Sequence, residues 1–337
     1  MLRNVAPMLV LALWAGRGAA QSAGAVSTKW IGGIQVQYNT TDVTGQPGSR
    51  FELRRTRIGA ELGVRDWITG KIDADIASGS VVLKAVWVNL DLAPAFQVRA
   101  GQLKRPFSAI ALTGYAELVT VERGVRIRGL AASDVGEEYD LLSESGYLGW
   151  DTGVAAHGSL GRGLGYEVGV FNGGDVVRGP GAAAARLSFA PLDGRPLRLS
   201  AAVSRQDVPG ATGMAWEGDV EWGAFRRPGL RLLAEAMAGD NLVVAGGKPG
   251  MRGAQVAAAW YMPADQGRVE AVELEGRVSY GDPDTSVDGD DGWLLTPGLA
   301  LYFFGRDRVQ VNWDVYVPGA STSFRHAALS MQLQLVH

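Results

Sequence analysis

The chain has 337 residues, of which 47 are Gly and none is Cys, with 47% hydrophobic and 20% charged residues. So much glycine argues against a mainly helical protein, and the absence of cysteine excludes a disulfide scaffold. The 32 basic and 35 acidic residues give a net charge of -3. A global basic field that would attract nucleic acid is therefore absent, and we expect no nucleic-acid partner.

The first twenty residues have the pattern of a secretory signal peptide. Arg3 precedes an apolar stretch over 8–15, and Gly18 and Ala20 place small residues at the -3 and -1 positions of a cleavage site. The apolar stretch is shorter than the ~20 residues that a membrane-spanning helix needs. We therefore expect residues 1–20 to be removed and residues 21–337 to form one domain. The mature chain then has 30 basic and 35 acidic residues, a net charge of -5.

The mature chain alternates between apolar and polar residues with a period of two, which is typical of β-strands. Over 68–77, for example, Ile68, Ile72 and Ile76 share one face while Lys71 and Asp73 share the other. Such segments predict about sixteen strands, at 29–38, 51–63, 67–77, 81–92, 96–103, 148–157, 164–172, 183–189, 196–205, 214–224, 229–237, 253–261, 267–280, 293–304, 308–316 and 324–336.

The connections between these strands tend to alternate in length. If the first strand runs outward, the inner turns are short, at 64–66, 93–95, 190–195, 225–228, 262–266 and 305–307. The outer loops are longer, at 39–50, 104–147, 238–252 and 281–292, although Ser78–Ser80 is a short outer turn. Alternating lengths and an even strand count are typical of an all-β, transmembrane antiparallel β-barrel of the bacterial outer membrane.

Aromatic residues gather where this orientation places the inner membrane boundary, which resembles half of an aromatic girdle. They are Trp67, Phe96, Trp260, Tyr261 and the stretch 302–304. The alternative is a soluble β-sandwich that buries its apolar faces. Closure of the sheet favours the barrel, because it removes sheet edges and satisfies every backbone group in lipid.

The connection 104–147 is too long for a turn, and we expect it to fold into the lumen and narrow the pore. Its first part is basic, with Lys104, Arg105, Arg123, Arg126 and Arg128, and its second part is acidic, with Asp134, Glu137, Glu138, Asp140 and Glu144. If only the basic part faces the pore, the channel is anion-selective. If both parts do, selectivity is weak, and the sequence leaves both possibilities open.

Arginine dominates the basic residues, since only five are Lys. Arg55, Arg57 and Lys71 share the faces that we assign to the lumen, and a guanidinium suits oxyanions because it donates two parallel hydrogen bonds. The alternative is that Arg55 and Arg57 form ion pairs with Asp73, Asp75 or Glu61 across the wall.

No catalytic or cofactor motif is evident. The three histidines, His157, His326 and His337, are far apart in sequence, and the acidic stretch 282–291 lacks the spacing of an EF-hand. We therefore expect no enzymatic activity, no cofactor and no metal site.

Several motifs in order resemble the phosphate-selective porin O and P family. They are the stretch 51–62, Trp67 with 71–76, 101–108, 121–123, 166–173, 186–192 and a hairpin over 298–316. The resemblance implies a sixteen-stranded outer-membrane porin, a homotrimer in contact with lipid and lipopolysaccharide, that passes anions such as phosphate. Two features depart from the family: lysine is scarce, and the last residue is His337 where such porins usually have Phe or Trp. His337 continues the predicted lipid-facing row of Leu333 and Leu335, so we expect assembly with an altered terminal signal.

The sequence thus predicts passive diffusion of small anions, with phosphate or polyphosphate as candidates, through an Arg-lined, water-filled pore. The predicted pore-lining, anion-binding residues are Arg55, Arg57, Lys71, Lys104, Arg105, Arg123, Arg126 and Arg128. One alternative is a general or weakly cation-selective porin, in keeping with the acidic net charge. Another is a plugged barrel that acts as a surface adhesin or anchor.

Overall fold

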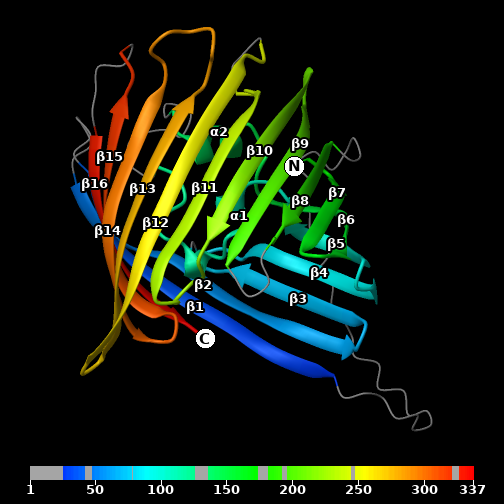
Figure 1. Ribbon diagram of the computed structural model, residues 1–337, viewed down its shortest axis with the longest axis horizontal. Helices are drawn as coiled ribbons and strands as arrows, with labels where there is room; N and C mark the ends of the chain where they lie inside the picture. The colour runs from blue at the N-terminus through cyan, green and yellow to red at the C-terminus, as the bar shows by residue number, and fades with distance from the viewer. Residues whose placement is uncertain are drawn as a thin grey trace, which may run out of the picture.

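Sixteen strands form a single closed barrel (Figure 1). The computed structural model describes residues 26–41, 48–77, 79–125, 136–173, 181–191, 196–243, 247–320 and 326–337. Every strand pairs antiparallel with its neighbours in sequence, and β1 closes the barrel against β16. The predicted fold class is confirmed, whereas the predicted signal peptide lies outside the described residues.

Each predicted strand corresponds to one observed strand. The strands are β1 (Ser27–Thr41), β2 (Gly48–Arg65), β3 (Ile68–Asp75), β4 (Val82–Ala93), β5 (Phe96–Lys104), β6 (Trp150–Gly161), β7 (Leu164–Phe171), β8 (Ala182–Phe189), β9 (Leu197–Val208), β10 (Ala211–Trp222), β11 (Gly229–Asp240), β12 (Gly250–Gln266), β13 (Val269–Asp282), β14 (Gly292–Phe304), β15 (Asp307–Pro318) and β16 (His326–Val336).

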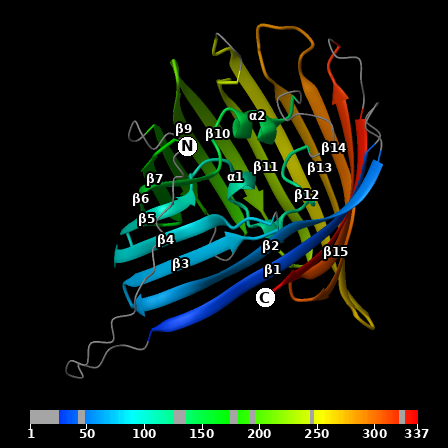
Figure 2. The same ribbon diagram turned by 180° about the vertical axis from the view of Figure 1, so that it is seen from behind.

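The long connection between β5 and β6 folds into the barrel, as the sequence predicts. It contains α1 (Ala109–Leu112), η1 (Tyr115–Glu117) and α2 (Glu138–Glu144). The α1 helix contacts β11, and α2 contacts β12 and β13 (Figures 1 and 2). In the described part of the chain, no helix has the length and apolar character needed to cross a bilayer.

The barrel buries polar residues and exposes apolar ones. On β10, Trp216 is 53% exposed, while the alternate residues Glu217 and Asp219 are each 4% exposed. On β13, Leu274 is 54% exposed between Glu273 and Glu275, which are buried. This inverted pattern excludes the soluble sandwich, because it places the apolar face of the sheet outward, toward lipid, and the polar face in the lumen.

The aromatic girdle is smaller than the sequence predicts. Trp67, Phe96 and Trp260 are exposed on the outer surface. Tyr261 and Tyr302 were expected in the same girdle, but both are buried in the lumen, where their rings meet edge to face at 5.3 Å. That part of the expectation is wrong, because neighbouring residues on a strand point to opposite faces of the sheet.

The assignment of the lipid-facing surface can be tested by placing a charged residue on it. Leu274→Arg, midway along β13, should lower the free energy of unfolding by ~2–4 kcal/mol, because the guanidinium would lie in hydrocarbon. Urea titration of the protein folded into phospholipid vesicles measures this change. Val287→Arg is the matched control, because Val287 is exposed in the 283–291 connection, and we expect a change within ~0.5 kcal/mol. Equal effects of the two variants would contradict the assignment of the outer surface.

Candidate functional site

Residues 115–123 of the infolded connection, here called the constriction segment, form the short 3-10 turn η1 and then a series of bends inside the lumen. Their backbone carbonyls have no sheet partner, and inward-facing side chains of the wall supply the donors. The bonds are Gln334 Nε2 to Ala116 O (3.2 Å), Arg231 Nη1 to Glu117 O (2.6 Å), Arg308 Nη2 to Leu118 O (2.8 Å), Gln310 Nε2 to Val119 O (2.7 Å) and Arg277 Nη1 to Glu122 O (3.2 Å). The polar wall therefore fixes the path of the segment.

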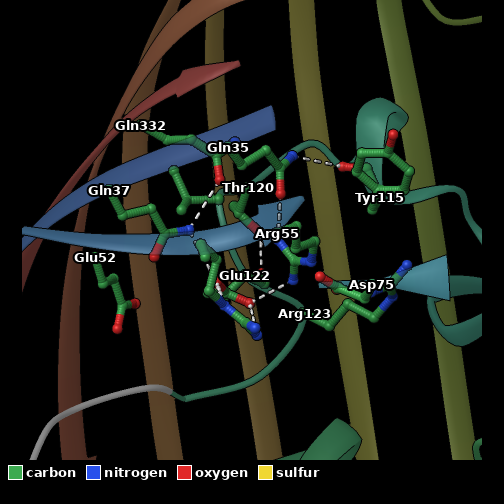
Figure 3. A network of polar contacts seen from close by, with 12 residues as sticks. Gln35, Gln37, Glu52, Arg55, Asp75, Tyr115, Thr120, Glu122, Arg123 and Gln332 are labelled. Atoms are coloured by element: carbon green, nitrogen blue, oxygen red, sulfur yellow. Dashed lines mark hydrogen bonds and ion pairs between the residues drawn. The ribbon is translucent and has the colours of Figure 1, made fainter. Parts of the chain in front are cut away.

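The Glu122 carboxylate joins the constriction segment to β1 and β2 of the wall (Figure 3). It accepts hydrogen bonds from Arg54 Nε and Nη2 at 2.6 and 2.9 Å, and from Arg55 Nη2 at 2.9 Å. Gln37 Nε2 donates to the same carboxylate at 3.0 Å. Arg55 also donates to Gln35 Oε1 at 2.6 Å. Arg55 is thus bound between wall and loop, and it is 5% exposed.

A β-bulge brings two consecutive arginines to Glu122. In the β1–β2 pairing, Gln35 faces Arg55 and Val36 faces Leu53, so Arg54 is an extra residue. Regular alternation would place Arg54 on the lipid face, and for that reason the sequence analysis did not select it. The adjacent Arg54-Arg55 pair in the sequence could have indicated the bulge, because in a regular strand one of the two charges would point into lipid.

Arg57 and Lys71 form ion pairs within the wall. Arg57 Nη1 lies 2.9 Å from Asp73 Oδ2, and Arg57 Nε lies 3.3 Å from Asp75 Oδ2. Lys71 Nζ lies 2.9 Å from Glu61 Oε1. The wall-pairing alternative therefore describes Arg57 but not Arg55, which binds Glu122 of the loop. Arg57 and Lys71 also line the open cavity described below.

Backbone carbonyls accept hydrogen bonds from two cations of the basic half of the loop, Lys104 and Arg123. Lys104 Nζ donates to the carbonyls of Ala111, Leu112 and Thr113, the last two at 3.2 and 3.3 Å. Arg123 Nη2 donates to Thr113 O at 2.5 Å. Within the described residues neither cation forms an ion pair. Burial lowers the pKa of Arg123, but an arginine stays charged at neutral pH.

The remaining predicted cations are placed differently. Arg105 is buried and joins the loop to the wall, with Nη2 at 2.7 Å from Asp151 Oδ2 and Nη1 at 2.6 Å from Gln206 Oε1. It does not line the cavity. Arg126 and Arg128 lie outside the described residues, as does Asp134.

The acidic half of the loop packs against the wall. Glu137 and Glu138 are fully buried, and Asp140 is 7% exposed. Glu137 accepts hydrogen bonds from Ser279 Oγ at 2.7 Å and from Asp140 N at 3.1 Å. The wall has Gly253 at the point of contact, where a Cβ atom would lie 2.8 Å from Glu138 Cγ. These carboxylates therefore do not face the open lumen.

Glu138 shares a donor with another carboxylate. Gln255 Nε2 donates both to Glu138 and, at 2.8 Å, to Glu235 Oε1. Ser108 Oγ, which caps α1, also donates to Glu235, at 3.1 Å. Burial, and then the nearby Glu235 and Glu137 carboxylates, raise the pKa of Glu138 well above its usual range. Burial and these carboxylates therefore favour the protonated form of Glu138.

This proton makes stability depend on pH. Because the pKa of Glu138 is higher in the folded protein than in the unfolded chain, Glu138 contributes fully to the free energy of unfolding below the unfolded pKa near 4.5. This contribution is lost as pH rises, at up to ~1.4 kcal/mol per pH unit. We expect the unfolding temperature in detergent to fall between pH 5 and pH 8, and to fall less in Glu138→Gln. Glu144→Gln changes an exposed carboxylate of the same helix and should follow the wild type. An unaltered pH slope in Glu138→Gln would contradict this assignment.

The anchoring role of Glu122 is tested by its removal. Glu122→Ala leaves Arg54 and Arg55 without their counter-charge, which should destabilise the folded loop by ~3–5 kcal/mol. Limited proteolysis of the folded protein should then cut within 105–149, whereas Glu144→Ala should remain protected. Protection equal to that of the wild type would contradict an anchoring role for Glu122.

An open cavity of about 900 Å³ lies between the constriction segment and the wall of the lumen. Eight basic and four acidic side chains line it. The basic ones are Lys29, Arg57, Lys71, Arg99, Lys104, Arg123, Arg226 and Arg306, and the acidic ones are Glu61, Asp73, Glu117 and Glu167. The lining therefore has an excess of positive charge, although the whole chain is acidic.

His337 lines one end of this cavity together with Val336, and it is exposed, as are Leu333 and Leu335. Its backbone N donates to Gly32 O at 3.0 Å, which ties the end of β16 to β1. Across the described residues, no group of three or more His, Cys, Asp or Glu side chains is arranged to hold a metal ion.

A closed barrel with an apolar outer surface, a polar lumen and an infolded loop is the architecture of an outer-membrane porin. The model of a family described as phosphate-selective porin O and P matches residues 30–289, and the chain belongs to this family. Family and fold together indicate a channel rather than an enzyme. No curated protein matches the sequence.

Solved porin structures share the fold at low sequence identity. An anion-selective porin from Comamonas acidovorans superposes with a TM-score of 0.67 and 11% identity, covering 93% of this chain and 100% of that one. The outer-membrane channel DcaP of Acinetobacter baumannii superposes with a TM-score of 0.63 and 13% identity, covering 95% of this chain and 99% of that one. The trimer form of OmpT from Vibrio cholerae superposes with a TM-score of 0.62 and 12% identity, covering 93% of this chain and 100% of that one.

Proposed function

We propose that this porin passes small anions in preference to cations. The observation that supports this most directly is the unequal placement of the loop charges. Lys104 and Arg123 line the cavity without an ion-pair partner among the described residues, whereas Glu137, Glu138 and Asp140 are buried against the wall. A permeating ion therefore meets the basic half of the loop and not the acidic half, and a cationic constriction favours anions.

A general or weakly cation-selective porin remains the alternative within transport. The net charge of the chain favours it, but selectivity depends on the charges beside the ion path, because exposed charges farther than ~10 Å are screened by salt. The excess of basic side chains around the cavity therefore affects ion selectivity more than the net charge of the whole chain does. The plugged-barrel alternative is less in keeping with an open cavity of about 900 Å³.

Phosphate and polyphosphate are the candidate substrates that family membership suggests. Several predicted anion ligands already have partners, because Arg55 binds Glu122 and Arg57 binds Asp73. An arriving phosphate would have to compete with these carboxylates. Lys104 and Arg123 are thus the stronger candidates for direct contact, with Arg126 and Arg128 as further predictions.

Three proposals concern the protein in the cell. We propose that residues 1–20 are cleaved as a signal peptide, since they fit the export pattern. We propose a homotrimer, in keeping with the trimer form of OmpT, which shares the fold. Contact of the apolar outer surface with lipid and lipopolysaccharide is the third, because exposed side chains such as Trp216 and Leu274 fit hydrocarbon.

The zero-current potential in a planar bilayer under a KCl gradient tests the proposed selectivity. We expect a potential of anion-selective sign, and Arg123→Gln should reduce the ratio of chloride to potassium permeability about fivefold. A unit charge a few ångströms from an ion contributes ~1 kcal/mol in water-like surroundings. Lys248→Gln is the matched control, because Lys248 is half-exposed and pairs with Asp240 at the outer end of the barrel. A potential of cation-selective sign would overturn the proposal.

A further inference from the structure

One side of the cavity combines aromatic rings with cations. Trp87 of β4, Tyr115 of η1 and Trp150 of β6 all line it. Each ring has a cation over it: the Arg99 Cζ lies 4.7 Å from the Trp87 ring centre, the Arg57 Cζ 5.2 Å from Tyr115, and the Lys104 Nζ 5.5 Å from Trp150. These distances are within the ~6 Å of a favourable cation–aromatic contact.

Arg99 differs from the other two cations because, within the described residues, its guanidinium forms no ion pair and no hydrogen bond. Its Nε is buried without a hydrogen-bond partner, and Glu167, which also lines the cavity, acts on it only through longer-range electrostatic attraction. Arg57, by contrast, pairs with Asp73 and Asp75, and Lys104 is held by loop carbonyls. The Arg99 donors are therefore available to a ligand in the cavity.

The wall beside Trp87 is apolar. Trp87 packs against a buried cluster that includes Leu103 and Phe171, and a Cβ at Gly153, beyond Gly101 in the sheet, would lie 2.6 Å from the Phe171 ring. Leu103 is the next inward-facing residue on β5, and it also lines the cavity. A water-filled channel for inorganic ions does not need such an apolar surface. Sites for small organic ligands have it, together with a few charged groups and a volume of roughly 300–1,000 Å³.

We propose that this cavity is a binding site for aromatic carboxylates, with the carboxylate on Arg99 and the aryl ring against Trp87. The inference rests on the proposed passage of anions and names an organic substrate class for it. Inorganic phosphate can use the charge of Arg99 but not the apolar surface beside it. Binding need only be moderate, because a permeating solute must also leave the site.

Block of the KCl current through single channels tests this proposal, with benzoate, acetate and inorganic phosphate as the probes at neutral pH. We expect benzoate to block at a concentration about tenfold lower than acetate or phosphate, in line with the strength of contacts to an aromatic face. Trp87→Leu should remove most of the preference for benzoate over acetate, and Trp87→Tyr should restore part of it. Arg99→Gln should weaken block by both carboxylates.

Trp216→Leu is the matched control, since Trp216 is exposed on the outer surface, and it should behave as the wild type does. Unchanged heat-modifiability in gel electrophoresis establishes that each variant is folded. Anion-selective channels that are blocked equally by benzoate and acetate, or more tightly by phosphate, would overturn the aromatic-carboxylate site alone. Channels of cation-selective sign would overturn the proposed function as well.

Discussion

A backbone segment that enters the lumen must find hydrogen-bond partners away from any sheet, and this constraint governs the interior of the barrel. The wall supplies them through inward-facing side chains such as Arg308, Gln310 and Gln334. These donors lie on the adjacent strands β15 and β16, and further donors come from β11 and β13, so the wall fixes the path of the constriction segment from several strands. The positions of Glu117, Glu122 and Arg123 follow from that path.

The same anchoring separates the charges of the loop. Glu122 turns toward Arg54 and Arg55, and Glu137 and Glu138 turn toward Ser279 and Gln255, so the acidic groups are used in holding the loop. Lys104 and Arg123 are left beside the open cavity. An acidic protein can in this way present a basic path to a solute, because the carboxylates that balance its charge are buried or lie elsewhere.

The outer surface and the lumen wall were largely predictable from the sequence. Alternation with a period of two gave all sixteen strands, because each residue step reverses the face on which a side chain lies. The infolded loop was predictable from its length. Arg54 could not be found in this way, because a bulge shifts the register at one position. Tyr261 and Tyr302 were misplaced because clustering of aromatics in sequence says nothing about which face each one occupies.

The barrel, the approximate strand boundaries and the supply of arginines can be predicted from the sequence, because these depend on local periodicity and composition. Which of those arginines have partners depends on how the strands and the loop meet in three dimensions. Arg55 meets Glu122 across 67 residues of sequence, and Arg99 lies over Trp87 because two strands pair in one register. Ion pairs and ring contacts depend on distances of a few ångströms between segments far apart in the chain, and no pattern within one segment encodes those distances.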